Sequence, residues 1–181
     1  MMKQLLLGGI FFCLIFCGSG AVTPAKACAG YTLILGSNGS LQQELLTQIL
    51  SLLISQRTGT TIQLVRYASQ AELLAAASGH EVDLLVVEVN PAGTIDSRQV
   101  LDDSELVLLE PFGYDNAQVA PVFQPAALKR FPALKRLVNR LAGLIDDLAL
   151  QRLEAEVASN HNQRDVAYKF LSEQKLIFGG G

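Results

Sequence analysis

Few residues of this chain have the type and spacing that catalysis requires. The two histidines, His80 and His161, each lie in a segment that reads as a turn or loop, and neither has a second ligand at metal-site spacing. The motifs G-x-S-x-G and G-x-x-x-x-G-K-[ST] do not occur in the sequence. The sequence therefore predicts no enzyme, no metal site and no cofactor, and exposed loop histidines are the simpler interpretation.

Two pairs of adjacent carboxylates, Asp102-Asp103 and Asp146-Asp147, are the remaining acid–base candidates. The second pair stands where a helix is predicted to begin, and acidic side chains are favourable at that end of the helix dipole. Capping is therefore the expected role of Asp146-Asp147.

The stretch Gly36-Ser37-Asn38-Gly39-Ser40 has two interpretations. Ser40 and Gln43 fit an S-x-x-Q capping box, and the glycines allow a sharp turn. Alternatively, free backbone N–H groups at this helix start could bind a carboxylate or another anion. Nothing local in the sequence separates the two interpretations.

The elements around this stretch alternate in type. Residues 31–35 and 83–89 read as buried strands, and residues 61–67 alternate in the manner of a strand. Between them, residues 40–57 and 69–79 are predicted helices, the first ending at Gly59 and the second opening with Ser69 and Glu72. This order predicts parallel strands with right-handed crossovers, whose ligand crevice lies beyond the carboxyl ends of the strands.

The second half is mainly helical. Strands are predicted at 105–110 and 118–124, and residues 92–104 are polar without periodicity. From Pro125 onward the sequence predicts helices with single apolar stripes. Five basic side chains cluster around one predicted helical hairpin, and they form either a solvated face or a docking face for an acidic partner: Lys129, Arg130, Lys135, Arg136 and Arg140.

The first residues read as an export signal. Lys3 precedes an unbroken apolar run from Leu5 to Cys17, and Ala25-Lys26-Ala27 fits an A-x-A cleavage site. We expect residues 1–27 to be a signal peptide and residues 28–181 to be one domain, periplasmic or secreted. Cys28 would then be the first residue, so lipid anchoring is conceivable, but Lys26 is unlike a lipoprotein signal.

Removal of residues 1–27 would leave 12 basic against 17 acidic residues, a net charge of −5. This acidic balance argues against nucleic acid as a partner. A single thiol, Cys28, would remain, so no internal disulfide is expected.

Three stretches together resemble the substrate-binding proteins of glycine betaine/choline-type ABC transporters. "LILGSNGSLQQELLTQIL" is similar to that family's opening strand, Gly-Ser turn and first helix, and "SQAELLAAASGHEVDLLVVEVNPAGT" to its second helix and third strand. The longest similar stretch begins at "LVLLEPFGYDNAQVAPVFQ" and runs through "AEV" at Val157. The resemblance implies an α/β fold: a lobe of a type 2 periplasmic-binding-protein fold with a mostly parallel sheet flanked by helices and a helical C-terminal half.

This chain departs from the family pattern in two features that the family uses to bind its ligand. The family closes two lobes on its ligand, whereas here Gly93 is followed within about a dozen residues by the strand near Leu106, which leaves room for one lobe only. The family holds quaternary ammonium groups in an aromatic cage by cation–π attraction. This chain has no Trp, and Val87 and Val89 flank Glu88 where aromatic residues are expected.

Two functions therefore stay open. The first is an exported solute-binding component of ABC uptake of quaternary ammonium osmolytes, with an ABC transporter permease as partner. The second is an interaction or accessory protein that has lost its small ligand, and a second copy in a homodimer is an alternative source of the missing wall. By resemblance, the expected ligand-binding residues are Ser37, Asn38, Glu88, Thr94 and Tyr114.

Overall fold

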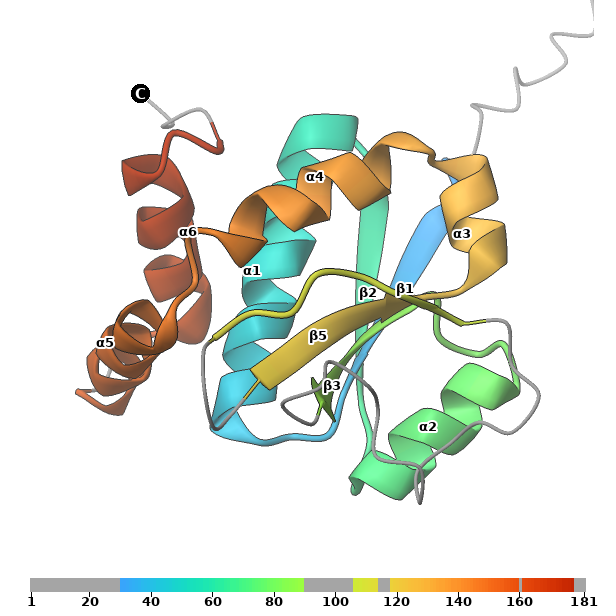
Figure 1. Ribbon diagram of the computed structural model, residues 1–181, viewed down its shortest axis with the longest axis horizontal. Helices are drawn as coiled ribbons and strands as arrows, with labels where there is room; N and C mark the ends of the chain where they lie inside the picture. Colours follow the sequence, from blue (N-terminus) through green and yellow to red (C-terminus); the bar gives the residue numbers. More distant parts are fainter. Residues whose placement is uncertain (1–29, 90–105, 114–117, 160, 178–181) are drawn as a thin grey trace, which may run out of the picture.

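The computed structural model describes residues 30–89, 106–113, 118–159 and 161–177. Strands and helices alternate in the first part, and helices dominate the last part (Figure 1). Their order and bounds are β1 (Thr32–Ser37), α1 (Leu41–Thr58), β2 (Thr61–Arg66), α2 (Gln70–Ser78), β3 (Leu84–Val89), β4 (Val107–Leu108), β5 (Gln118–Phe123), α3 (Pro125–Arg130), α4 (Ala133–Ala142), α5 (Asp147–Ala158) and α6 (Gln163–Glu173). The predicted signal sequence and Cys28 lie outside the described residues.

The five strands form one open sheet in the order β2-β1-β3-β5-β4. β1 pairs in parallel with both β2 and β3, whereas β5 runs antiparallel to β3 and to β4. Four strands therefore share one direction, and the predicted single-lobe, mostly parallel α/β fold is confirmed. Within the described residues, no helix is long and apolar enough to cross a membrane.

The edge strand β4 is shorter than the predicted strand 105–110. Leu109 N–H donates to the carbonyl of Pro121 (2.9 Å), so the side of Pro121 that lacks an N–H faces Leu109. A proline cannot return the second bond of an antiparallel pair, so the ladder is interrupted there, and pairing resumes only at an isolated antiparallel bridge between Phe112 and Val119. On the opposite side β5 pairs with β3 along its whole length, with Pro121 opposite Val86.

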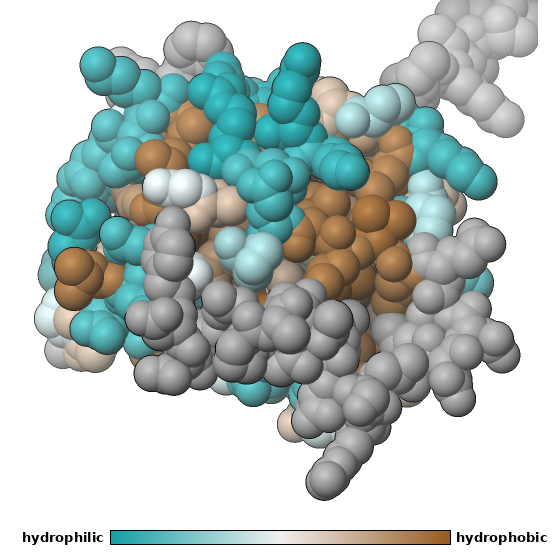
Figure 2. All heavy atoms as spheres, in the orientation of Figure 1, coloured by the Kyte–Doolittle hydropathy of each residue, from teal (hydrophilic) through white to brown (hydrophobic). Residues whose placement is uncertain are grey.

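Two apolar layers cover the two faces of the sheet. The larger layer contains α1 and the C-terminal helices, and α1 contacts three strands as well as α4, α5 and α6. The smaller layer lies under α2 on the other face. Figure 2 shows hydrophilic side chains over α4 and an apolar area beside α3.

The helical spacing of Leu41, Leu45, Ile49, Leu52 and Leu53 predicts one apolar stripe on α1, but the helix is buried more completely than that stripe implies. Leu41 at the start of that stripe is 41% exposed, while Leu46, Leu50 and Ile54, which lie outside it, are buried. The C-terminal helices cover this second side of α1. Polar residues of α1 are therefore enclosed too, among them Gln43 and Thr47.

Helix ends follow the sequence signals closely. Ser40, Ser69 and Asp146 are N-caps, and the side chain of each accepts a hydrogen bond from the backbone N–H three residues later. Gly59 ends α1 in the left-handed conformation (φ 69°). Gly79 ends α2 as predicted but keeps φ −76°, and the left-handed residue is the following His80 (φ 59°).

Gly36 in β1 allows α2 to approach the sheet. A Cβ at this position would lie 2.5 Å from Leu73 Cδ1 and 3.1 Å from Val82 Cγ1. Both neighbours are fully buried, so neither has room to move away.

We expect Gly36→Ala to lower the free energy of unfolding by about 1–3 kcal/mol, because it overpacks this contact. Chemical denaturation would measure the loss. Gly143→Ala is the matched control, since a Cβ there meets nothing within 4 Å and φ is −85°, and it should be neutral or stabilising by about 0.4–1 kcal/mol. Equal effects of the two substitutions would contradict the close approach of α2.

A polar cluster lies at the N-terminal end of β1. Tyr31 Oη donates to Asp83 Oδ1 (2.6 Å), Ile34 N–H donates to Asp83 Oδ2 (2.9 Å), and the Arg130 guanidinium lies 3.7 Å from the centre of the Tyr31 ring. Burial raises the pKa of the Tyr31 phenol, the hydrogen bond to Asp83 and its charge raise that pKa further, and Arg130 opposes the rise.

The Tyr31 phenol should therefore ionise above its usual pKa of 10.0, and Arg130→Gln should raise that pKa further. Because the folded state favours the neutral phenol, its contribution to stability holds below pH 10 and is lost as the pH passes the raised pKa. The ¹³Cζ chemical shift of Tyr31 across alkaline pH would follow this ionisation. Arg136→Gln on α4 serves as control, and a downward shift with Arg130→Gln would exclude the proposed charge effect.

Candidate functional site

The carboxyl ends of the parallel strands carry the turn between β1 and α1. Gly39 adopts φ 81°, and Ser40 caps α1 by accepting from Gln43 N–H (3.3 Å). Asn38 Oδ1 accepts from Ser40 N–H (3.0 Å), and Gln43 Oε1 accepts from Asn38 N–H (3.2 Å). The backbone N–H groups of Asn38, Ser40 and Gln43 are thus occupied by side chains of the same turn, which favours the capping interpretation of this stretch.

The predicted capping box is formed with one difference. Its serine half is present, but the Gln43 side chain reaches Asn38 N–H and not the backbone of Ser40. Asn38 takes that place by accepting from Ser40 N–H. An Asn two residues before the cap therefore extends the box by one more hydrogen bond.

An amide network joins this turn to the start of α2. Gln70 Oε1 accepts from Asn38 Nδ2 (3.2 Å) and from Gln43 Nε2 (2.9 Å). Gln43 is only 1% exposed, so its hydrogen bonds are made away from water. Gln70 Nε2 is buried and has no hydrogen-bond partner among the described residues. The network fixes two neighbouring strand-end loops relative to each other, and no local sequence pattern signals the role of Gln70.

Ser37 and Glu88 lie on one face of the sheet at this end. β1 and β3 are in parallel register, with Gly36 beside Leu85, and Ser37 and Glu88 continue the rows of Leu35 and Val86 on the α1 face. Ser37 is 7% exposed, whereas Glu88 is exposed. Glu88 is therefore the predicted site residue among the described ones that is most accessible to a solute.

Three of the five predicted site residues can thus be located. Ser37 and Asn38 are adjacent at the end of β1, Glu88 lies on the neighbouring strand, and Thr94 and Tyr114 lie outside the described residues. Val87 and Val89, which stand at the expected aromatic positions, are buried under α2. Tyr67 follows β2, but its ring packs near Gly36 in the α2 layer and its pKa is raised by burial.

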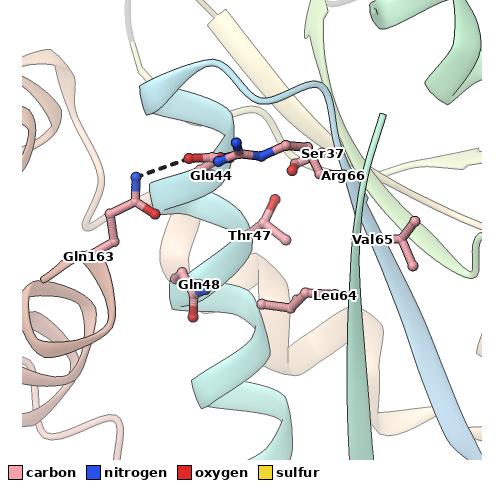
Figure 3. A pocket seen from close by; sticks show the side chains of 8 residues that line it. All are labelled: Ser37, Glu44, Thr47, Gln48, Leu64, Val65, Arg66 and Gln163. Carbon is pink, nitrogen blue, oxygen red and sulfur yellow. Dashed lines mark hydrogen bonds and ion pairs between the residues drawn. The ribbon is translucent and has the colours of Figure 1, made fainter. Parts of the chain in front are cut away.

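A polar groove that sequence reasoning missed lies beside this edge, between α1, β2 and the start of α6 (Figure 3). Its volume is about 210 Å³. Arg66 of β2 forms an ion pair with Glu44 of α1, and Gln163 Nε2 of α6 donates to the same carboxylate (3.1 Å). The groove unites residues more than a hundred positions apart in the chain, which no local sequence pattern could signal.

The remaining titratable candidates have structural roles. His80 lies in a turn, where its Nδ1 is 3.1 Å from Gln124 Oε1, and His161 Nδ1 is 2.9 Å from the Ser159 hydroxyl. No three His, Cys, Asp or Glu side chains among the described residues are placed to hold a metal ion. Asp146 caps α5, as predicted, and Asp102-Asp103 lies outside the described residues.

The basic side chains of α3 and α4 are exposed. Arg130 differs from the others because it stacks on Tyr31. A solvated face and a docking face for an acidic partner are both compatible with this arrangement.

The fold and one part of the sequence are similar to known proteins. Residues 98–173 match the family described as the substrate binding domain of the ABC-type glycine betaine transport system. Among solved structures, apo YehZ from Escherichia coli is 10% identical with a TM-score of 0.69, and the match covers 81% of this chain and 100% of that chain. A glycine betaine/carnitine/choline ABC transporter structure is 11% identical with a TM-score of 0.67, covering 80% of this chain and 99% of that one.

No curated protein sequence matches this chain. The family profile and the two structures agree nonetheless, and the resemblance to the glycine betaine/choline-type substrate-binding proteins is confirmed. At these identities the structures establish the fold, and the described residues form one lobe of it.

We expect Gln43→Ala to destabilise the protein by about 1–3 kcal/mol, because it leaves the part-buried Asn38 N–H without its acceptor and removes one of the two donors to Gln70 Oε1. Urea denaturation would measure this loss. Gln151→Ala on the exposed face of α5 is the matched control and should stay within about 0.5 kcal/mol. A loss at Gln43 no larger than at Gln151 would mean that the amide network does not hold the turn.

Proposed function

We propose that this protein is an exported solute-binding component related to ABC uptake of glycine betaine/choline-type quaternary ammonium osmolytes. The observation that carries the proposal is the match of residues 98–173 to the substrate binding domain of the glycine betaine transport system. The similar fold of a glycine betaine/carnitine/choline transporter structure supports it. The protein would act by binding and not by catalysis, with an ABC transporter permease as its partner.

The proposed ligand site is the strand-end edge of the lobe. Glu88 is exposed on β3 and carries the negative charge that a quaternary ammonium group requires, and Ser37 and Asn38 lie at the end of the neighbouring parallel strand β1. Thr94 and Tyr114 complete the proposed set. In this proposal residues 1–27 direct export and residues 28–181 form the binding domain in the periplasm, where a solute captured outside the cytoplasmic membrane would be delivered to the permease.

One lobe encloses a small solute from one side only. Ligand sites usually bury about 70–90% of the ligand surface, so a second surface is needed for tight binding. We propose that a partner supplies it, either the permease or a second copy of this chain. The ligand would then lie between this lobe and that partner.

A second function, an accessory protein without a small ligand, is favoured by one specific observation. The side-chain amides of Asn38 and Gln43 make hydrogen bonds within the turn and to Gln70, and Ser37 is almost completely buried. A turn whose polar groups satisfy one another offers few of them to a solute. In that case the protein would act through its surfaces.

Thermal unfolding of the protein with millimolar glycine betaine, choline, carnitine and proline tests the first proposal. A ligand at 100 times its dissociation constant adds about 2.7 kcal/mol, which corresponds to roughly 5–10 °C for a domain of this size. We expect a rise with at least one quaternary amine, a smaller rise in Glu88→Gln, and an unchanged rise in the exposed control Glu173→Gln. No rise with any of the four solutes would reject osmolyte binding at the strand-end edge and leave the accessory function.

A further inference from the structure

The groove between α1, β2 and α6 has a mixed polar and aliphatic lining. Its eight lining residues are Ser37, Glu44, Thr47, Gln48, Leu64, Val65, Arg66 and Gln163. Figure 3 shows Arg66 and Gln163 reaching Glu44 from opposite sides, with Thr47 and Gln48 on α1 and Leu64 on β2 below them. Leu64 is 41% exposed, which is unusual for a large apolar side chain of this protein and gives the groove an uncovered aliphatic wall.

The charges in the groove cancel each other. Glu44 and Arg66 are paired, and Gln163 donates to the second carboxylate oxygen of Glu44. An ionic ligand would have to break this pair and would gain little in return, because the exposed Arg66 is also solvated. The lining therefore suits a neutral ligand that offers both hydrogen-bond donors and acceptors.

Thr47 supplies the observation that a ligand would explain. Thr47 is 4% exposed, and its buried hydroxyl oxygen has no hydrogen-bond partner in the part of the chain that the structure describes, although the residue lines the groove. A buried hydroxyl without a partner costs about 1–3 kcal/mol, so such a group is uncommon in a folded protein. A hydroxyl group on a ligand could either donate a hydrogen bond to the Thr47 oxygen or accept one from the Thr47 hydroxyl.

We propose that this groove is a second binding site, for a small neutral polyhydroxylated solute such as a polyol or monosaccharide. The ligand's hydroxyl groups would bond Thr47, Gln48 and the outer edges of the Glu44–Arg66 pair, and its C–H face would lie on Leu64. The volume of about 210 Å³ limits the ligand to this size, since pockets for drug-sized ligands begin at about 300 Å³. The groove adjoins the strand-end edge and shares Ser37 with it, but the other groove residues, Thr47 and Leu64 among them, are not part of the ligand site proposed above. The inference therefore does not depend on that proposed function.

The full-length protein can be tested by titrating glycerol, glucose and myo-inositol while recording ¹H–¹⁵N correlation spectra. We expect saturable shifts confined to the amides of the groove, including Thr47, Leu64 and Gln163, with at least one of the three solutes. Glycine betaine should leave these signals in place. Shifts that are absent, unsaturable or spread over the molecule would overturn the proposal.

Two matched variants separate binding from folding. Thr47→Val keeps the shape and removes the hydroxyl; the ligand-free variant should be at least as heat-stable as the parent, while affinity for the solute falls roughly 2–12-fold. Ser172→Ala removes another buried hydroxyl without a partner, on α6 and outside the groove lining, and should leave the affinity unchanged. A Thr47→Val protein that is less stable in the absence of solute, or that binds as tightly as the parent, would refute the role given to this hydroxyl.

Discussion

The burial of α1 on two sides is the constraint on which the rest of this structure depends. One side of the helix covers the sheet, and the other is covered by α4, α5 and α6. The helix therefore carries apolar residues over most of its circumference, and removing the C-terminal helices would expose Leu46, Leu50 and Ile54. Both the helical second half and the strands are held in place through this one element.

The burial of α1 also encloses polar side chains, and their hydrogen bonding differs along the helix. Gln43, near the N-terminus, is satisfied by Asn38 and Gln70. For the Thr47 hydroxyl, one turn further, the described residues offer no partner. The two residues stand four positions apart on one face of the helix, so the same packing creates a fixed turn at the strand ends and a polar groove beside it.

Local signals predicted most of the fold. The alternation of strands and helices, the serine and aspartate caps and Gly59 all depend on residues close in sequence, and the structure contains them within one or two positions. The extent of β4 was not predictable in this way, because it depends on which strand lies opposite and on the missing N–H of Pro121. The second buried side of α1 was missed for a related reason: the helices that cover it come more than seventy residues later.

The site was less predictable than the fold. The resemblance located Ser37, Asn38 and Glu88 at one edge of the sheet, because a strand order fixes which loops are neighbours. Whether an amide faces a solute or another amide depends on contacts between loops, and Gln70 on α2 decides this for Asn38. The groove, in turn, requires α6 to pack against the start of α1, a contact between the two ends of the chain.

The unequal lengths of the two edge strands have a consequence for the sheet as a surface for assembly. On one side the edge strand β4 is only two residues long, so a foreign strand finds little to pair with. On the other side β2 presents a full six-residue border without a proline. The two edges of the sheet therefore differ in their tendency to aggregate. If crowding or partial unfolding brings chains together, a foreign strand would add to β2 and not to β4.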